Sequence, residues 1–264
     1  MYFKILNEEM NHHGFQYKEG LNIDTVPFNP KGHCEPGGFY FTNKKHIFDY
    51  INFGTLIADV EVPENAKVYK NGTKWKADRI IISNIRPIED FVSDLSENEI
   101  LSIIRENGLF LRYVKKQTVN ICFEAVKQNG LALQYVKEQT PALCLEAIKR
   151  YSVALYYVNE QTPELCLAAV KQNGCILRYI EIQTPELCLE AVKQDGNALF
   201  YVEEQTPELC WEAVKQDGYN IRYVKEQTPE LCLEAMKQDS DSIRFIKIQT
   251  PELCLEAMKL PKSN

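Results

Sequence analysis

The last two thirds of the sequence repeat every 22 residues. Each copy resembles Gln-Thr-Pro-Glu-Leu-Cys-Leu-Glu-Ala. A regular period of this length is typical of a solenoid, because each unit is too short to bury its own apolar face and must stack on its neighbours. The period therefore predicts a stack of short units that presents an extended surface. The repeated threonines are Thr118, Thr140, Thr162, Thr184, Thr206, Thr228 and Thr250.

The composition is that of a soluble acidic protein. The hydrophobic content is 45%, the formal net charge is -7 and the pI is about 5.3. An acidic balance argues against a general electrostatic grip on nucleic acid or an anionic membrane. The first residues, Met1 to Glu9, contain neither a secretion signal nor a spanning helix. We expect a cytoplasmic protein with protein partners, outside membranes and without a cofactor.

Each repeat predicts two very short helices. In the copy that begins at Thr184, the threonine can cap a helix and Pro185 suits its first position. Gly196 would end that helix in a left-handed conformation. A second apolar stripe follows at Ala198, Leu199 and Val202 and predicts a second helix. The leucine-rich repeat is the alternative at this period, but the copies lack its alternating strand pattern.

The array is expected to have distinct ends. Ser96 lies 22 residues before Thr118 and predicts a degenerate first helix over 96–107. The array would then run from 91 to 264, with the last of seven periods truncated. An apolar helix face near the carboxyl end could stay exposed, which leaves self-association there as one possibility.

Seven of the nine cysteines occupy one repeated position. Their 22-residue spacing places equivalent thiols on stacked helices, too far apart for a disulfide, and no second ligand lies at metal-binding spacing. We interpret them as buried packing residues and expect no metal site. Outside the array, Cys34 follows His33, a pair without further ligands. The repeated cysteines are Cys122, Cys144, Cys166, Cys188, Cys210, Cys232 and Cys254.

Three columns of the repeat vary while the rest barely change. If the second element is an α-helix, these columns are related by i, i+3 and i+7 and share one face. A variable face on a fixed scaffold indicates partner binding, and arginine and aromatic residues are common in binding hot spots. Drift of an unconstrained surface is the alternative. The candidate partner-binding residues are Arg112, Gln134, Tyr156, Arg178, Phe200, Arg222 and Arg244. The flanking columns are Leu109, Leu131, Val153, Cys175, Asn197, Tyr219 and Asp241, and Lys116, Glu138, Glu160, Ile182, Glu204, Glu226 and Ile248.

Residues 1–90 lack the repeat and predict a small α+β domain. Strand-like stretches at 14–17, 38–42, 56–62, 67–69 and 79–83 are divided by glycine and proline turns. Residues 43–51 predict one helix, capped by Thr42. The predicted fold is thus a small α+β amino-terminal domain followed by an all-α solenoid of helix-turn-helix repeats.

Two resemblances follow from these motifs. Copies of Gln-Thr-Pro-Glu-Leu-Cys-Leu-Glu-Ala-Val-Lys-Gln-Asn-Gly type resemble the uncharacterised short-helical-repeat proteins of giant amoeba-infecting DNA viruses. The segments 12–17, 36–42 and 74–78 resemble a domain that also precedes ankyrin arrays in those viruses. This resemblance implies a non-enzymatic interaction protein in the cytoplasm of the infected host cell or in the virion.

The second resemblance concerns the amino-terminal domain alone. His13-Gly14, then Gly38 to Phe41 with the following helix, is similar in order to the His and Tyr elements of ADP-ribosyltransferases. That resemblance implies that His13 and Tyr40 would hold the nicotinamide end of NAD. The catalytic glutamate of that family has no clearly placed counterpart around 74–79. Three hypotheses remain: a protein-binding adaptor, an NAD-binding enzyme, and an RNA reader that stacks bases on Tyr156 or Phe200.

Overall fold

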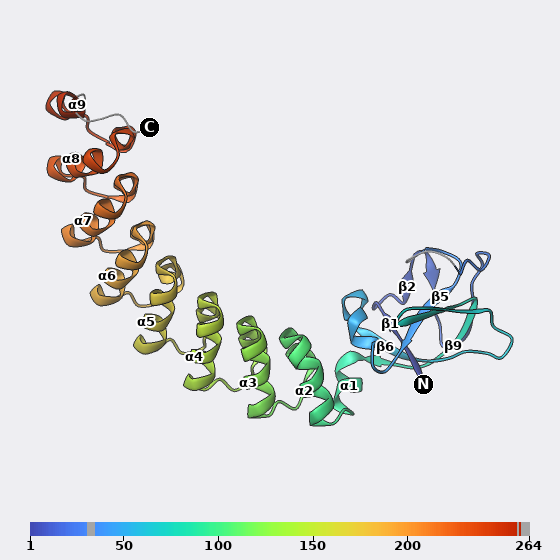
Figure 1. Cartoon of the computed structure of the whole chain (residues 1–264). Coiled ribbons are helices and arrows are strands. Elements are labelled where there is room, and N and C mark those ends of the chain that lie inside the picture. The colour runs from blue at the N-terminus through green and yellow to red at the C-terminus, as the bar shows by residue number, and fades with distance from the viewer. Residues whose placement is uncertain (31–34, 258, 260–264) are drawn as a thin grey trace. The chain divides into compact units, whose positions relative to one another are not determined.

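The computed structural model describes residues 1–30, 35–257 and 259. It forms two compact units, shown in Figure 1. The first comprises Met1–Ile103 with Tyr113–Lys116, and the second comprises Ile104–Arg112 with Gln117–Asn264. His33 and Cys34, raised above as two adjacent metal ligands, lie outside the described residues.

An antiparallel sheet of seven strands forms the core of the first unit, in the order β4-β9-β6-β1-β5-β8-β7. β1 lies at its centre, paired with β5 and β6. Phe39, Phe41, Ile80 and Ile82 belong to one cluster of buried side chains on this sheet. The strands are β1 (Tyr2–Leu6), β4 (Gly20–Ile23), β5 (Phe39–Asn43), β6 (Leu56–Glu61), β7 (Val68–Asn71), β8 (Lys74–Ala77) and β9 (Arg79–Pro87).

Two smaller elements complete this unit beside α1 (Ile88–Ser93). β2 (Asn11–His12) and β3 (Phe15–Gln16) form a hairpin. The helix predicted at 43–51 is instead a 3-10 helix, η1 (Ile47–Phe53), without a side-chain cap. The prediction failed because Asn43 still pairs with Tyr2 in the sheet, so that Thr42 is a strand residue and its hydroxyl donates to Thr73 O.

Eight α-helices alternate with seven 3-10 helices in the described part of the repeat array. Helices α3 to α8 lie side by side in one row (Figure 1). The α-helices are α2 (Glu97–Glu106), α3 (Val119–Gln128), α4 (Pro141–Arg150), α5 (Pro163–Gln172), α6 (Pro185–Gln194), α7 (Pro207–Gln216), α8 (Pro229–Gln238) and α9 (Pro251–Ala257). The 3-10 helices are η2 (Gly108–Tyr113), η3 (Gly130–Tyr135), η4 (Ser152–Tyr157), η5 (Gly174–Tyr179), η6 (Gly196–Tyr201), η7 (Gly218–Tyr223) and η8 (Ser240–Phe245).

The repeated threonines start the helices, as the sequence predicted. Thr184 has an extended backbone, and its hydroxyl accepts a hydrogen bond from the amide of Leu187 at 3.3 Å. Pro185 occupies the first turn, where no amide donor is required. The apolar stripe of α6 is buried, with Ala191 and Val192 fully so. The predicted α-solenoid architecture is therefore confirmed, and the leucine-rich alternative is wrong for the described array.

The glycines have a different role from the one predicted. None of those in the array has a positive φ, and the residue after α6, Asp195, is extended rather than left-handed. A Cβ placed on Gly130 would lie 2.5 Å from the carbonyl oxygen of Ala147 in the next repeat. Glycine thus permits close stacking between repeats, a contact that sequence within a single repeat does not reveal.

Candidate interaction face and pocket

The glutamine before each threonine joins its own repeat to the next. Gln183 donates through Nε2 to the carbonyl of Tyr201 at 2.9 Å, and its Oε1 accepts from the amide of Glu203 at 3.1 Å. Both partners lie at the end of η6, whose last turn lacks backbone partners of its own. We call this contact the glutamine bridge. Equivalent bridges start at Gln117, Gln139, Gln161, Gln205 and Gln227.

The repeated cysteines take part in these bridges. The thiol of Cys188 lies 3.5 Å from Gln183 Oε1, within reach of a weak S–H donor. Burial raises the pKa of Cys188 and of the thiols equivalent to it from Cys122 to Cys232. Every cysteine described is a free thiol, and no cluster of three potential ligands for a metal occurs among the described residues. The cysteines therefore pack the core and orient the glutamines.

The variable residues of the 3-10 helices stack on tyrosines. The ring of Tyr156 lies 5.1 Å from that of Tyr157 in its own repeat and 5.3 Å from that of Tyr179 in the next. The guanidinium carbon of Arg178 lies 4.5 Å from the centroid of Tyr179 and 6.0 Å from that of Tyr201. Each variable residue thus spans two repeats.

The same arrangement continues through two further repeats. Phe200 lies between Tyr201 and Tyr223, at 5.0 and 5.3 Å between ring centroids, and Arg222 lies 4.5 Å from Tyr223. Tyr156 and Phe200 are each 62% exposed, so their outer faces meet solvent. We call this surface the aromatic ladder. Its members are Tyr156, Tyr157, Arg178, Tyr179, Phe200, Tyr201, Arg222 and Tyr223.

The candidate residues outside the ladder are also exposed, but the third variable column is not helical. Arg112, Gln134 and Arg244 lie at the matching position of η2, η3 and η8. Residues such as Ile182 follow the 3-10 helix, in the link to the next threonine. The predicted i, i+3, i+7 face is therefore wrong at its last position. A 3-10 helix has three residues per turn, so only the first two columns share a face.

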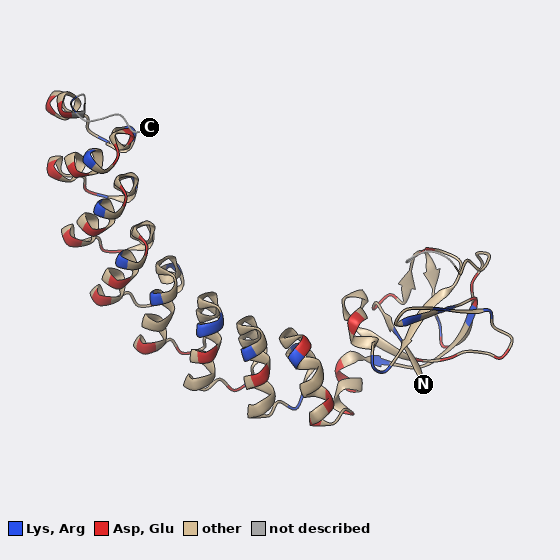
Figure 2. Cartoon of the chain, in the orientation of Figure 1, with Lys and Arg blue, Asp and Glu red and all other residues tan. Residues whose placement is uncertain are grey.

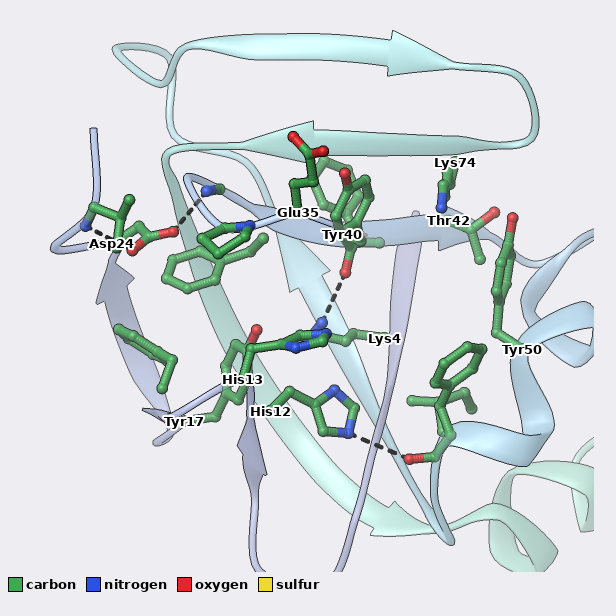
Figure 3. A pocket seen from close by; sticks show the side chains of 18 of the residues that line it. Lys4, His12, His13, Tyr17, Asp24, Glu35, Tyr40, Thr42, Tyr50 and Lys74 are labelled. Atoms are coloured by element: carbon green, nitrogen blue, oxygen red, sulfur yellow. Dashed lines mark hydrogen bonds between the residues drawn. The ribbon is translucent and has the colours of Figure 1, made fainter. Parts of the chain in front are cut away.

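A pocket of about 330 Å³ lies on the sheet of the first unit. It is lined by β1, β5, η1 and the β2–β3 turn, and both His13 and Tyr40 face it (Figure 3). His13 and Gly14 have φ values of 52° and 81°, as a two-residue hairpin turn requires. The structure therefore brings together the two residues that the sequence paired for NAD. His13 is exposed, and the Lys74 ammonium lies 4.5 Å above the ring of Tyr40.

The central side chain of the pocket is Lys4, which the sequence did not single out. Its ammonium donates to the carbonyl oxygen of Tyr40 at 2.9 Å and lies 4.8 Å from the ring centroid of Tyr17 (Figure 3). Burial lowers the pKa of Lys4 to about 8. His12 hydrogen-bonds to Phe53 O, and burial followed by the charge of Lys4 lowers its pKa. Burial also raises the pKa of Tyr17, with the Asp24 carboxylate adding to the effect.

The two carboxylates of the pocket are not arranged around His13 and Tyr40. Asp24 accepts from the amides of Gly38 at 2.6 Å and Val26 at 2.9 Å, which holds its loop. Glu35 is exposed and lies 3.4 Å from the amide nitrogen of Asn29. Asp24 therefore has a structural role. The residues that face each other across the pocket can bind a ligand, and Lys4, His12 and His13 supply its nitrogen donors.

Signals for the missed residues were present in the sequence. The bridging glutamine is identical in every copy from Gln117 to Gln249, although a half-exposed glutamine has no packing reason to be fixed. Lys4 is the single charged residue of the apolar strand Tyr2–Leu6. Neither signal identifies a partner, because both side chains bond to segments distant in the chain.

Comparison with known proteins places the array in a recognised class of repeats. A domain of unknown function, DUF4116, matches residues 142–183, 162–206, 184–227 and 206–249, each match spanning about two repeats. Uncharacterized protein R869 of Acanthamoeba polyphaga mimivirus is 37% identical over 133 residues, which are 44% of this chain and 96% of that protein. The chain belongs to this family of giant-virus proteins.

Other members of the family are larger. Putative ankyrin repeat protein R868 of the same virus is 37% identical over 131 residues, 44% of this chain and 65% of the relative. Putative ankyrin repeat protein R896 is 36% identical over 85 residues, 30% of this chain and 26% of the relative. The chain therefore matches less than two thirds of these two proteins. No solved structure gives a significant match. Within the described residues, every helix is too short or too polar to cross a membrane.

Proposed function

We propose that this giant-virus repeat protein is a non-enzymatic scaffold that binds a protein partner through the aromatic ladder. The observation that carries the proposal is the continuous stacking of variable residues on fixed tyrosines. Each variable side chain is held between two rings, so little rotamer freedom remains to be lost on binding. Arginine and aromatic side chains are the ones most enriched in binding hot spots.

The binding face would include all seven candidate positions. Arg112, Gln134 and Arg244 would extend the ladder at either end. Three relatives are named as putative ankyrin repeat proteins, and solenoid arrays present extended surfaces for binding. We place the protein in the cytoplasm of the infected cell or in the virion.

The test uses the full chain as bait in extracts of infected host cells. The double variant Arg178→Glu, Arg222→Glu reverses two ladder charges, and Lys171→Glu, Lys193→Glu makes the same charge change on exposed ends of α5 and α6. We expect the ladder variant to lose a protein that the wild type and the control retain. Equal capture by both variants would contradict the binding face. Concentration-dependent mass in isolated protein would instead indicate self-association.

RNA binding is a different outcome of the same design. Acidic and basic residues occur together along the whole array (Figure 2), which is unlike the basic stripe of a nucleic-acid site. A band shift with RNA that weakens steeply with salt and is lost in the ladder variant would replace the protein partner with RNA.

A second candidate function concerns the pocket. His13 and Tyr40 line one cavity, which supports NAD binding as the alternative. Saturating NAD should then raise the melting temperature of the full chain, and His13→Ala should abolish the shift. An unchanged melting temperature would eliminate this candidate.

A further inference from the structure

Lys4 is a buried positive charge without an opposite charge beside it. The side chain is 7% exposed, and the ammonium has one hydrogen-bond acceptor, the carbonyl of Tyr40. Among the described residues, no carboxylate lies within ion-pair distance of it, whereas nine other ion pairs occur. An ammonium has three donors, so Lys4 can still bond to a group inside the pocket.

Further nitrogen groups surround Lys4. His12 lies close enough for the charges of Lys4 and His13 to lower its pKa. The ionisable groups on the elements around Lys4 are His12, His13, Tyr17, Asp24, Tyr40 and Lys74. The Asp24 carboxylate already accepts two backbone amides. The centre of the pocket therefore carries an excess of positive charge.

The walls around this charge are flat and largely apolar. Phe15 and Phe39 contact each other at 4.6 Å between ring centroids, and Tyr17 closes the same side at 5.0 and 5.4 Å from them. Tyr40 and Tyr50 line the pocket as well. A volume of about 330 Å³ is in the lower range of pockets that enclose one small molecule.

We propose that the pocket binds a small organic anion, a flat apolar molecule with one carboxylate or phosphate group that pairs with Lys4 Nζ. The aromatic walls enclose the flat body, and His12 and His13 donate to the anionic group at the mouth. This site is independent of the aromatic ladder, so the failure of either proposal leaves the other intact.

The experiment titrates the full chain with four probes by calorimetry. Benzoate and phenyl phosphate carry the proposed features, benzamide lacks the charge, and inorganic phosphate lacks the flat body. We expect benzoate or phenyl phosphate to bind at least about tenfold more tightly than the other two probes, as a charged hydrogen bond implies. A preference between the two anions identifies the head group. Equal binding of benzamide, or no binding of either aromatic anion at millimolar concentration, overturns the proposal.

Two measurements tie binding to Lys4. Lys4→Met should weaken the preferred anion by about tenfold or more, whereas Lys18→Met, an exposed lysine outside the pocket, should leave it unchanged. At pH 9 most of the free Lys4 is neutral, so anion binding should take up close to one proton. Binding enthalpies in two buffers of different ionisation heat report that proton on the wild type, even if the variant does not fold. Absence of proton uptake, or unchanged affinity in Lys4→Met, contradicts the assignment.

Discussion

Replacing Gln183 by alanine should break one glutamine bridge and loosen the array at that place. The substitution removes the bond from Nε2 to Tyr201 O at 2.9 Å and the bond from the Glu203 amide to Oε1 at 3.1 Å. Each such bond contributes about 0.5 to 1.5 kcal/mol net. The Cys188 thiol also loses its acceptor. We therefore expect a loss of about 2 to 3 kcal/mol at this interface between repeats.

The assay must resolve single repeats, because long arrays depart from two-state unfolding. Amide hydrogen exchange measures local opening directly. In Gln183→Ala the Glu203 amide should exchange about 30 to 150 times faster, the factor that corresponds to 2 to 3 kcal/mol. The control Glu204→Ala alters an exposed neighbour and should change exchange by less than about 0.5 kcal/mol.

A conservative variant separates the donor from the acceptor. Gln183→Glu keeps an oxygen for the Glu203 amide but places a carboxylate against the carbonyl of Tyr201. It should be at least as destabilising as alanine at neutral pH and recover as the carboxyl group is protonated at acid pH. Exchange at Glu203 that is the same in Gln183→Ala as in Glu204→Ala would refute the idea that the bridge joins the repeats.

Three further predictions concern buried groups. Lys4→Met should stabilise the first unit at pH 7 by about 1 to 2 kcal/mol, because the cost of roughly 3 kcal/mol for a lowered pKa outweighs one lost hydrogen bond; urea unfolding of that unit measures it. In the wild type the unfolded state binds more protons than the folded state between pH 8 and 10.5, so stability should rise over that range, and a flat profile, or the same rise in Lys4→Met, would exclude this origin. Ser242→Ala should stabilise by about 1 kcal/mol, because Ser242 Oγ is buried without a partner and the equivalent Ala198 packs well; a loss of thermal stability would show that the hydroxyl is needed. The pKa of Cys175 is raised to about 11 by burial and by the Asp195 carboxylate, so peptide mass spectrometry after iodoacetamide at pH 8 should find it, and the buried thiols of α3 to α8, unmodified until urea is added; rapid labelling of the folded chain would be inconsistent with these pKa values.

Local signals determined how far the sequence could be interpreted. Thr184 and Pro185 act within one turn of the helix they start, so the α-helices could be placed from the sequence. The element after Gly196 has only six residues, and its apolar pattern suits an α-helix and a 3-10 helix equally. The variable positions Arg178 and Phe200 were identifiable by comparing repeats, but their stacking on Tyr201 was not, because that contact depends on the offset between neighbouring units.

Contacts between distant segments explain the other misses. β1, β4 and β8 were not predicted, because they are short and their polar residues resemble loop sequence. Lys4 became notable only when the sheet brought it under the β2–β3 turn. His13 and Tyr40 were paired by resemblance, and they do line one pocket.

The glutamine bridge also explains how such a chain can change length during evolution. Every bridge reaches forward by the same 18 and 20 residues, as from Gln161 to Tyr179 and Glu181. If recombination deletes or duplicates 22 residues inside the array, the glutamine before the junction finds an equivalent carbonyl and amide at the same offset. A deletion of any other length leaves both partners out of reach. Unequal crossing-over between these nearly identical copies can therefore shorten or extend the binding surface in single-repeat steps without a compensating mutation.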